Sequence, residues 1–358
     1  MIHVIIGTKG QIIKMFPILK ILEERGISYN YIDTGQHEAL TKKFRMHLKM
    51  RDPDYICTQS SSDITKTITG LRWMMKIICV SVFCRKQLFK GDKGGLCLVH
   101  GDTVSTFLGA VMGKLSGQRV VHVEAGYRTN KLFKPFPEEL IRRLVDRWSD
   151  INFVFKDDGE AALKREGVKG KMFHVKENTV VDAVEIAKQN QGSVDLPDDY
   201  FLISVHRYET IYNKSRMEFI VDAAIKMSRQ KKVVWGLHEP TKHALQRYNL
   251  YDKLAQNENI ILRGIFDYFD FIYAIYKSDF LMTDGGGPQD ETKFLGIPCL
   301  LVRTEHEKPG YGNVCECPFD EIKFNHFMEN RDAYRQQEVS KHPSPSAAIV
   351  DILAAHNY

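Results

Sequence analysis

Long hydrophobic runs are missing from this chain of 358 residues. No apolar stretch approaches the roughly 18 residues that read as a membrane-spanning helix. The first residues, MIHVIIGTKG, have neither the basic start nor the long apolar core of a signal peptide, and they predict a strand instead. We therefore expect a cytoplasmic protein that has no membrane partner.

Excess charge and paired cysteines are also lacking. The net charge of +5 is too small for a nucleic-acid-binding surface, although it suits an anionic ligand such as a phosphorylated metabolite. The seven cysteines are odd in number and scattered, mostly in apolar runs, so we expect reduced, buried thiols. Cys315 and Cys317 are close together but have no second pair at zinc spacing, so we expect no metal site.

Short β-rich runs alternate with longer amphipathic stretches along the whole chain. The length exceeds one ordinary core, and two successive βα series predict two doubly wound, mainly parallel sheets, an α/β fold. A polar seam near 170–195 separates the two series. We expect an N-terminal domain over 1–172, with a C-terminal helix at 344–358 packing back on it, and a C-terminal nucleotide-binding domain over 173–343. Strands are expected at 3–7, 29–35, 95–101, 119–126, 151–155, 171–175, 200–207, 231–238, 259–264, 279–286 and 297–303.

Polar and charged residues recur directly after these strands. Ligands of doubly wound sheets bind outside the carboxyl ends of the strands, so the strand-ending residues are the candidates for function. His, Asp, Glu and Arg end strands in both halves, which we explain by a cleft lined from two domains. The strand-ending segments are GTKGQ, TGQH, HGDT, HVEAGYR, VHRYET, GLHEP and TDGGGPQDE.

Three carboxylates are candidates for proton transfer. Asp102 follows an apolar strand, but a turn or capping role next to Thr103 explains it equally well. Glu124 follows VVHV at an edge that is partly dehydrated, and such a place can raise a carboxyl pKa towards a value useful for proton transfer. Glu138 starts a helix, where the helix dipole favours it, and its spacing from Arg142 predicts an i,i+4 pair on one helix face.

The second half offers histidines and a glycine-rich turn. His206 and His238 end strands, although a structural role is the commoner one for a lone histidine. Gly285–Gly287 lead into a helix, where a phosphate can be bound, or they simply make a tight turn. Glu291 can accept hydrogen bonds from ribose hydroxyls. The first turn, GTKGQ, lacks the GxGxxG spacing, so we expect no dinucleotide cofactor, while Lys9 and Lys14 can serve an anion.

Taken in order, these motifs resemble the non-hydrolysing UDP-N-acetylglucosamine 2-epimerase family. The resemblance covers the whole chain. It implies two Rossmann-like domains around a central cleft, as in glycosyltransferase-B enzymes, and interconversion of UDP-GlcNAc and UDP-ManNAc without a cofactor. It also implies a homodimer, and surface polysaccharide as the usual destination of the product. The matching motifs are GT with IKM, TGQH, HGDT, HVEAGYRT, PFPEE, NTVVDA, HRYE, TDGGGPQDE and LGIPCLLVR.

The resemblance also implies roles for particular residues. The chemistry is anti elimination of UDP to a 2-acetamidoglucal followed by re-addition, which needs acid/base groups on both faces of the sugar. Three carboxylates would handle protons, while a histidine and an arginine would face the diphosphate. The catalytic positions are Asp102, Glu124, Glu138, Arg142 and His206. The nucleotide-binding positions are Lys9, Lys14, Arg207, His238, Gly285, Gly286, Gly287 and Glu291.

Some positions depart from the family pattern. Lys9 and Gln11 stand where the family usually has arginine and glutamate, so we expect altered base or ribose contacts, and Gly285 replaces a serine. One alternative is the hydrolysing branch, which releases UDP and ManNAc and usually carries a glycine pair before the glutamate of HVEAG. A glycosyltransferase of the same architecture and a non-catalytic nucleotide-sugar sensor are the others.

Overall fold

The computed structural model describes residues 1–58, 67–129, 136–189, 194–304, 311–337 and 343–355. The chain forms two compact units, and each is described by itself. Unit 1 comprises Met1–Ala183 with His342–Tyr358, and unit 2 comprises Val184–Lys341. The domain boundaries expected after residues 172 and 343 stay a prediction.

Unit 1 is built on a seven-stranded sheet in the order β3-β2-β1-β4-β5-β6-β7, and its neighbouring strands pair in parallel. The strands next to the centre are fully buried apolar runs, as expected for a sheet covered on both faces. The strands are β1 (Ile2–Ile6), β2 (Tyr29–Asp33), β3 (Tyr55–Ile56), β4 (Leu96–His100), β5 (Arg119–Val123), β6 (Ile151–Val154) and β7 (Lys171–His174).

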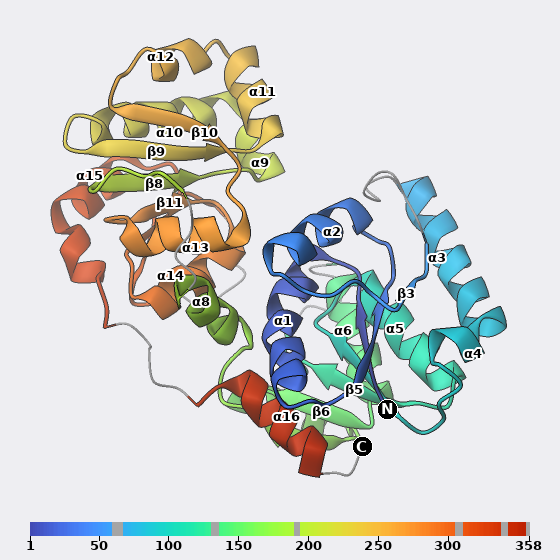
Figure 1. The fold of residues 1–358 in the computed structure, drawn as a ribbon. Coiled ribbons are helices and arrows are strands. Elements are labelled where there is room, and N and C mark those ends of the chain that lie inside the picture. Colours follow the sequence, from blue (N-terminus) through green and yellow to red (C-terminus); the bar gives the residue numbers. More distant parts are fainter. Residues whose placement is uncertain (59–66, 130–135, 190–193, 305–310, 338–342, 356–358) are drawn as a thin grey trace. The chain divides into compact units, whose positions relative to one another are not determined.

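Helices cover this sheet, and the C-terminal helix α16 packs along the first helix, α1 (Figure 1). Arg25 at the end of α1 pairs with Asp351 of α16 at 2.5 Å. Asp182 accepts a hydrogen bond from the backbone N–H of Ser346 at 2.8 Å. The helices are α1 (Lys9–Glu24), α2 (Glu38–His47), α3 (Thr67–Phe83), α4 (Arg85–Leu88), α5 (Val104–Leu115), α6 (Glu138–Trp148), α7 (Asp157–Arg165), α8 (Val180–Gln189), which runs across the division between the units, and α16 (Pro345–Ala355).

Unit 2 is built on a six-stranded parallel sheet in the order β10-β9-β8-β11-β12-β13. Its strands are β8 (Tyr200–Ser204), β9 (Lys232–Leu237), β10 (Ile260–Gly264), β11 (Leu281–Thr283), β12 (Cys299–Leu301) and β13 (Val314–Glu316). Its helices are α9 (Tyr208–Ile211), α10 (Lys214–Met227), α11 (Glu239–Arg247), α12 (Tyr251–Ala255), α13 (Tyr268–Lys277), α14 (Gly286–Leu295), α15 (Glu321–Asn330) and the 3-10 helix η1 (Arg331–Tyr334).

The predicted α/β class, with two Rossmann-like doubly wound sheets, is confirmed. In each sheet the strand order reverses at the first strand of the unit. β1 lies between β2 and β4, and β8 lies between β9 and β11. These are the topological switch points, beside which the loops diverge and leave room for a ligand. The residues that follow β1, β4, β8 and β11 are therefore placed for function.

The cysteines depart in part from expectation. Five of the seven free thiols are buried, but Cys79 is exposed on α3 and Cys84 is half-buried. The prediction of buried thiols was wrong for these two because the surface of α3 is itself apolar. In the part of the chain that is described, no helix is long and apolar enough to cross a membrane.

Candidate active site

Glu124 directly follows β5 and has a left-handed backbone, with φ of 73°. Such a conformation is uncommon for a residue with a side chain and is often found at functional positions. Three groups contact its carboxylate on the same oxygen, Oε2: Lys14 Nζ at 2.6 Å, Asn178 Nδ2 at 2.9 Å and His100 Nε2 at 3.2 Å. None of the described contacts falls on Oε1, so this oxygen is left for other partners.

These contacts decide the charge of Glu124. Burial by itself raises the pKa of the carboxyl, but Lys14 and then His100 outweigh it and hold the pKa well below its usual value. The expectation of a raised pKa was therefore wrong, because the opposite charge of Lys14 exceeds the cost of burial. Burial of His100, together with the charges of Lys14 and His122, lowers the pKa of His100 despite the nearby carboxylate. Glu124 is thus an anion beside a neutral imidazole.

Gln11 connects the two strands at the switch point of unit 1. Its Oε1 accepts hydrogen bonds from the backbone N–H groups of Gly7 and Thr8 at 2.9 and 3.2 Å. Its Nε2 donates to the backbone carbonyl of His100 and to Thr106 Oγ1, both at 3.0 Å. The side chain is buried, so its amide holds the protein's own backbone at the ends of β1 and β4. These contacts lie within the protein, and the expectation of an altered base or ribose contact stays a prediction.

Asp102 lies in the turn between β4 and α5, and its carboxylate accepts a hydrogen bond from Arg142 of α6. Arg142 also pairs with Glu139 at 3.4 Å, and its guanidinium lies over the ring of Tyr127. The predicted pair between Glu138 and Arg142 is therefore wrong, since Arg142 turns to Asp102 and to the residue after Glu138. Oε2 of Glu138 is buried and has no hydrogen-bond partner among the described residues.

The side chain of Asp284 holds the backbone at the switch point of unit 2, as the side chain of Gln11 does in unit 1. It follows β11 and is fully buried. Its carboxylate accepts hydrogen bonds from the backbone N–H groups of His206, at 3.1 and 3.3 Å, and Arg207, at 2.9 Å, directly after the neighbouring strand β8. The ring of His206 stacks on that of His238, with centroids 4.5 Å apart. The switch point of unit 2 is therefore fixed by one carboxylate, with two histidines stacked beside it.

The glycine-rich turn forms the beginning of α14. Gly285 caps the helix in an extended conformation, and its N–H donates to Thr283 Oγ1 at 3.0 Å. A Cβ atom built on Gly286 or Gly287 meets nothing within 4 Å, so there is room beside these two glycines. Glu291 lies in the second turn of α14 and is 8% exposed. An open helix N-terminus attracts an anion.

The predicted residues therefore form separate groups. The structure brings Asp102 to Arg142 and Lys14 to Glu124 in unit 1, and His206 to His238 in unit 2. Lys9 is exposed, with its ammonium 5.1 Å from the ring centre of Phe44. Sequence reasoning missed three contributing residues, although each lies inside a motif that it quoted: His100 of HGDT, Asn178 of NTVVDA and Asp284 of TDGGG.

In the described ranges, no group of three or more His, Cys, Asp or Glu side chains is arranged to hold a metal ion. Burial raises the pKa of Cys317, one of the two neighbouring cysteines, to about 11.

Comparison with known proteins agrees with the motifs. The family model described as UDP-N-acetylglucosamine 2-epimerase matches residues 20–313. The UDP-N-acetylglucosamine 2-epimerase of Methanocaldococcus jannaschii is 32% identical over 322 residues, which cover 86% of this chain and 85% of that protein. A solved structure of UDP-GlcNAc 2-epimerase from this organism has a TM-score of 0.83 at 29% identity, with 99% of both chains covered. Its structure in complex with UDP-GlcNAc and UDP has a TM-score of 0.76 at 29% identity and the same coverage.

Proposed function

This chain belongs to the UDP-N-acetylglucosamine 2-epimerase family, and on this premise we propose that it interconverts UDP-GlcNAc and UDP-ManNAc without hydrolysis. The related enzyme that was solved with UDP-GlcNAc and UDP supports a UDP-sugar as the substrate. The proposed steps need no redox cofactor, because the elimination and the re-addition each move only a proton and a leaving group.

The reaction inverts one carbon of the sugar. A base removes the C2 proton while the C1–O bond breaks and UDP departs, which leaves a 2-acetamidoglucal. UDP then adds back to C1, and a proton reaches C2 from the opposite face. Acid/base groups are therefore needed on both faces of the ring, and positive charge is needed beside the departing diphosphate.

One observation carries the assignment of a base in unit 1. Oε2 of Glu124 is held by Lys14, His100 and Asn178, whereas Oε1 has none of the described contacts. A carboxylate that is anchored by one oxygen is oriented but can still accept a proton on the other. We assign the proton transfers to Asp102, Glu124 and Glu138. The buried, unpartnered oxygen of Glu138 supports its inclusion.

The diphosphate and the nucleoside are assigned to the remaining predicted residues. In unit 2, the room beside Gly286 and Gly287 at the start of α14 supports a phosphate at Gly285–Gly287, and the buried Glu291 in the same helix supports a contact with ribose hydroxyls. In the same unit we assign His206 and Arg207 to the diphosphate and His238 to the nucleotide. In unit 1 we assign Arg142 to the diphosphate and Lys9 and Lys14 to the nucleotide.

Exchange of the C2 proton with solvent tests the proposed function. In D2O, UDP-GlcNAc incubated with the protein is expected to gain deuterium at C2 and to reach a mixture with UDP-ManNAc, measured by NMR. The elimination makes this exchange unavoidable, because the proton removed from C2 is replaced from the solvent. A glycosyltransferase or a sensor would leave C2 unlabelled even after long incubation.

The same spectra separate the two branches of the epimerase family. The hydrolysing alternative predicts free ManNAc in step with free UDP, while the proposed reaction conserves the nucleotide sugar. The motif HVEAGYR, with no glycine pair before the glutamate, supports the non-hydrolysing reaction. Accumulation of stoichiometric free ManNAc would reject it.

We also propose that the protein is a cytoplasmic homodimer. The presence of seven free thiols supports a reducing compartment. Helix α3 presents an exposed apolar stripe at the spacing of a helix–helix contact, which supports a second copy as the partner. The stripe consists of Leu71, Met75, Ile78 and Val82, which are 60%, 57%, 42% and 49% exposed.

A single charge in this stripe is expected to dissociate the dimer. Ile78→Glu places a carboxylate in the middle of the apolar contact, where burying it without a partner is unfavourable. Sedimentation equilibrium is expected to show a dimer for the original chain and a monomer for the variant. A matched Lys76→Gln exchange on the same helix, outside the stripe, lowers the net charge by the same one unit and is expected to remain a dimer. A monomeric original chain would contradict the proposal.

A further inference from the structure

His122 of β5 lies in the interior of unit 1 between two acceptors. Its Nδ1 is 2.6 Å from Asp146 Oδ1, and its Nε2 is 2.7 Å from the backbone carbonyl oxygen of Gly101. Both His122 and Asp146 are fully buried. A carbonyl oxygen can only accept a hydrogen bond, and so can an ionised carboxylate. Both ring nitrogens of His122 must therefore donate, and an imidazole that donates twice carries a positive charge.

The surroundings of Asp146 favour its ionised form. Its second oxygen, Oδ2, receives the guanidinium of Arg128 at 2.8 Å and the N–H of Gly126 at 3.3 Å. Burial raises the pKa of Asp146, whereas the neighbouring charges lower it, and of these Arg128 is a permanent cation whose effect does not depend on the charge of His122. The alternative, a protonated Asp146 that donates to a neutral His122, would leave Arg128 facing an uncharged acid.

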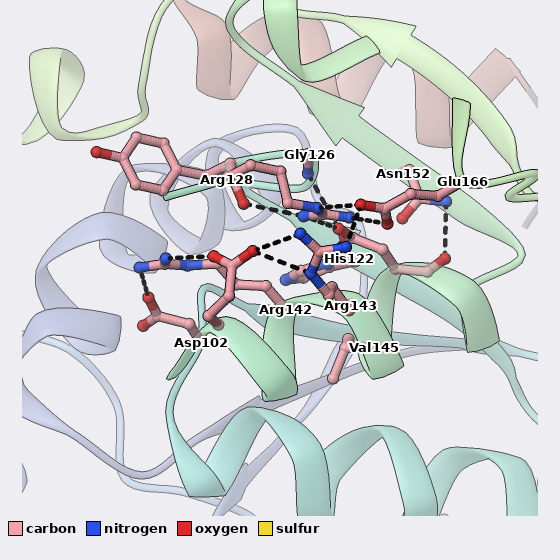
Figure 2. A network of polar contacts seen from close by, with 12 residues as sticks. Asp102, His122, Gly126, Arg128, Arg142, Arg143, Val145, Asn152 and Glu166 are labelled. Atoms are coloured by element: carbon pink, nitrogen blue, oxygen red, sulfur yellow. Dashed lines mark hydrogen bonds and ion pairs between the residues drawn. The ribbon is translucent and has the colours of Figure 1, made fainter. Parts of the chain in front are cut away.

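Asp146 and His122 belong to a closed ring of polar contacts. Arg128, Glu166 and Arg143 of this ring are labelled in Figure 2. Arg128 binds Glu166 through two hydrogen bonds, at 2.9 and 2.8 Å. Arg143 joins Glu166, at 2.7 Å, to Glu139, at 3.0 Å.

The ring closes through Asp102. Glu139 contacts Arg142, and Arg142 binds the carboxylate of Asp102. Gly101 precedes Asp102 in the chain. Its carbonyl oxygen accepts a hydrogen bond from His122, and its N–H donates one to the carbonyl oxygen of Val123 at 3.0 Å. Asp102 is therefore held from two sides: by its side chain through Arg142, and by its preceding peptide through His122.

Charge balance agrees with the hydrogen bonds. The ring contains four carboxylates, Asp102, Glu139, Asp146 and Glu166, and three arginines, Arg128, Arg142 and Arg143. An imidazolium at His122 supplies the fourth positive charge. Without it, the ring would carry one excess negative charge, and two of its carboxylates, Glu139 and Asp146, are fully buried, where an unpaired charge is costly.

We propose that His122 is a buried imidazolium that closes this ring of alternating charges and thereby positions Asp102 for catalysis. His122 touches no substrate and is a positioning residue that acts through the Gly101 carbonyl. The charge state stands on the geometry alone, whereas the effect on catalysis rests on the proposed function. The groups that face His122 are Asp146 from α6, the Gly101 carbonyl after β4 and, at longer range, His100 from β4.

A second buried histidine of the same sheet provides a contrast. Nε2 of His3, in β1, lies 3.1 Å from Asp92, but its Nδ1 lies 2.9 Å from the amide nitrogen of Asn30. That nitrogen also donates to the carbonyl of Leu88 at 2.9 Å, which fixes the amide orientation. Nδ1 of His3 must accept, so this imidazole is neutral, and burial lowers its pKa.

Activity tests the positioning role. A glutamine at position 122 carries one donating nitrogen and one accepting oxygen, so His122→Gln places its oxygen against either Asp146 or the Gly101 carbonyl. We expect kcat for epimerisation to fall by up to about 100-fold while KM changes little, because a small displacement of a catalytic group costs rate rather than binding. His3→Gln, in the same sheet, is expected to leave kcat unchanged. An unchanged kcat in folded His122→Gln would overturn the positioning role.

Nitrogen NMR of the unaltered chain tests the charge directly. In protein labelled with 15N-histidine, both ring nitrogens of His122 are expected at the protonated position at pH 7.5, while His3 shows one protonated and one bare nitrogen. The His122 signals are assigned by their loss in His122→Gln. This measurement needs no activity, so it separates failure of this inference from failure of the proposed function. A bare ring nitrogen on His122 at this pH would overturn the inference.

Discussion

Glu124→Gln is expected to lower kcat for epimerisation, and the rate of deuterium entry at C2, by about 10²–10⁴-fold. Glutamine preserves the shape and offers one oxygen to Lys14, His100 and Asn178, which contact Oε2 of the carboxylate. Its amide nitrogen then replaces Oε1, the oxygen left for the substrate. An amide nitrogen accepts no proton, so the substitution removes the chemistry and keeps the hydrogen-bonded anchor.

Two controls make this result specific. Glu160→Gln removes a carboxylate from α7, where Glu160 pairs with Lys164, and it is expected to leave the rate unchanged. A thermal unfolding curve of Glu124→Gln close to that of the original chain shows that the fold survives. A rate within a few-fold of the original would exclude Glu124 as a proton-transfer group and would leave Asp102 and Glu138 to supply it.

The sequence predicted most of the fold because the long elements carry strong patterns. The buried runs of β1, β4 and β8 were visible as short continuous apolar stretches, and amphipathic helices such as α1 as period-3.6 patterns. The strands β3 (Tyr55–Ile56) and β13 (Val314–Glu316) were missed. Both lie at sheet edges and have two or three residues, too few to establish a period.

The sequence also placed the candidate residues at the strand ends, but it could not supply their partners. Lys14 and Glu124 are 110 residues apart, and Asn178 is 54 residues from Glu124. The direction of the pKa shift depends on these partners, so burial alone gave the wrong sign. Burial can be inferred from a local pattern, whereas an opposing charge on a helix far away in the sequence, such as Lys14 on α1, cannot.

The error at Arg142 has a related cause. Helical spacing correctly puts Arg142 within reach of residues three and four positions earlier, and Glu139 is the one that pairs. The stronger partner, Asp102, comes from the turn after β4, 40 residues away in sequence. Local spacing identifies the possible partners of a side chain on its own helix. Partners from other elements are known only once the fold is known.

Lys14→Met is expected to reduce kcat/KM at neutral pH by about 10²–10³-fold, since Lys14 is the cation nearest to Glu124 and is also proposed to serve the diphosphate. Loss of the diphosphate contact alone would lower kcat/KM without moving its dependence on pH. Loss of the pair with Glu124 has a different consequence, because Lys14 is the largest influence that lowers the pKa of Glu124. Its removal must raise that pKa.

The acidic limb of the pH profile therefore distinguishes the two roles. The profile of kcat/KM reports groups of the free enzyme, and a base is active only when ionised. In the original chain the depressed pKa keeps Glu124 ionised to low pH, so the acidic limb lies below the usual range for a glutamate. In Lys14→Met the limb is expected to move to higher pH. Lys20→Met, which removes an exposed lysine from the same helix, is expected to change neither the rate nor the limb.

The unfolding free energy is expected to depend on pH in the direction that the lowered pKa of Glu124 requires. A carboxyl whose pKa is depressed by folding stabilises the protein above its unfolded pKa of about 4.3, and this contribution is lost as the pH falls through the folded value. The difference in unfolding free energy between the original chain and Lys14→Met is therefore expected to be largest near neutral pH and to shrink in acid, as measured by urea unfolding. If the difference stays constant down to acidic pH and the kinetic limb does not move, Lys14 does not control the ionisation of Glu124. In that case its effect on the rate comes from the diphosphate alone.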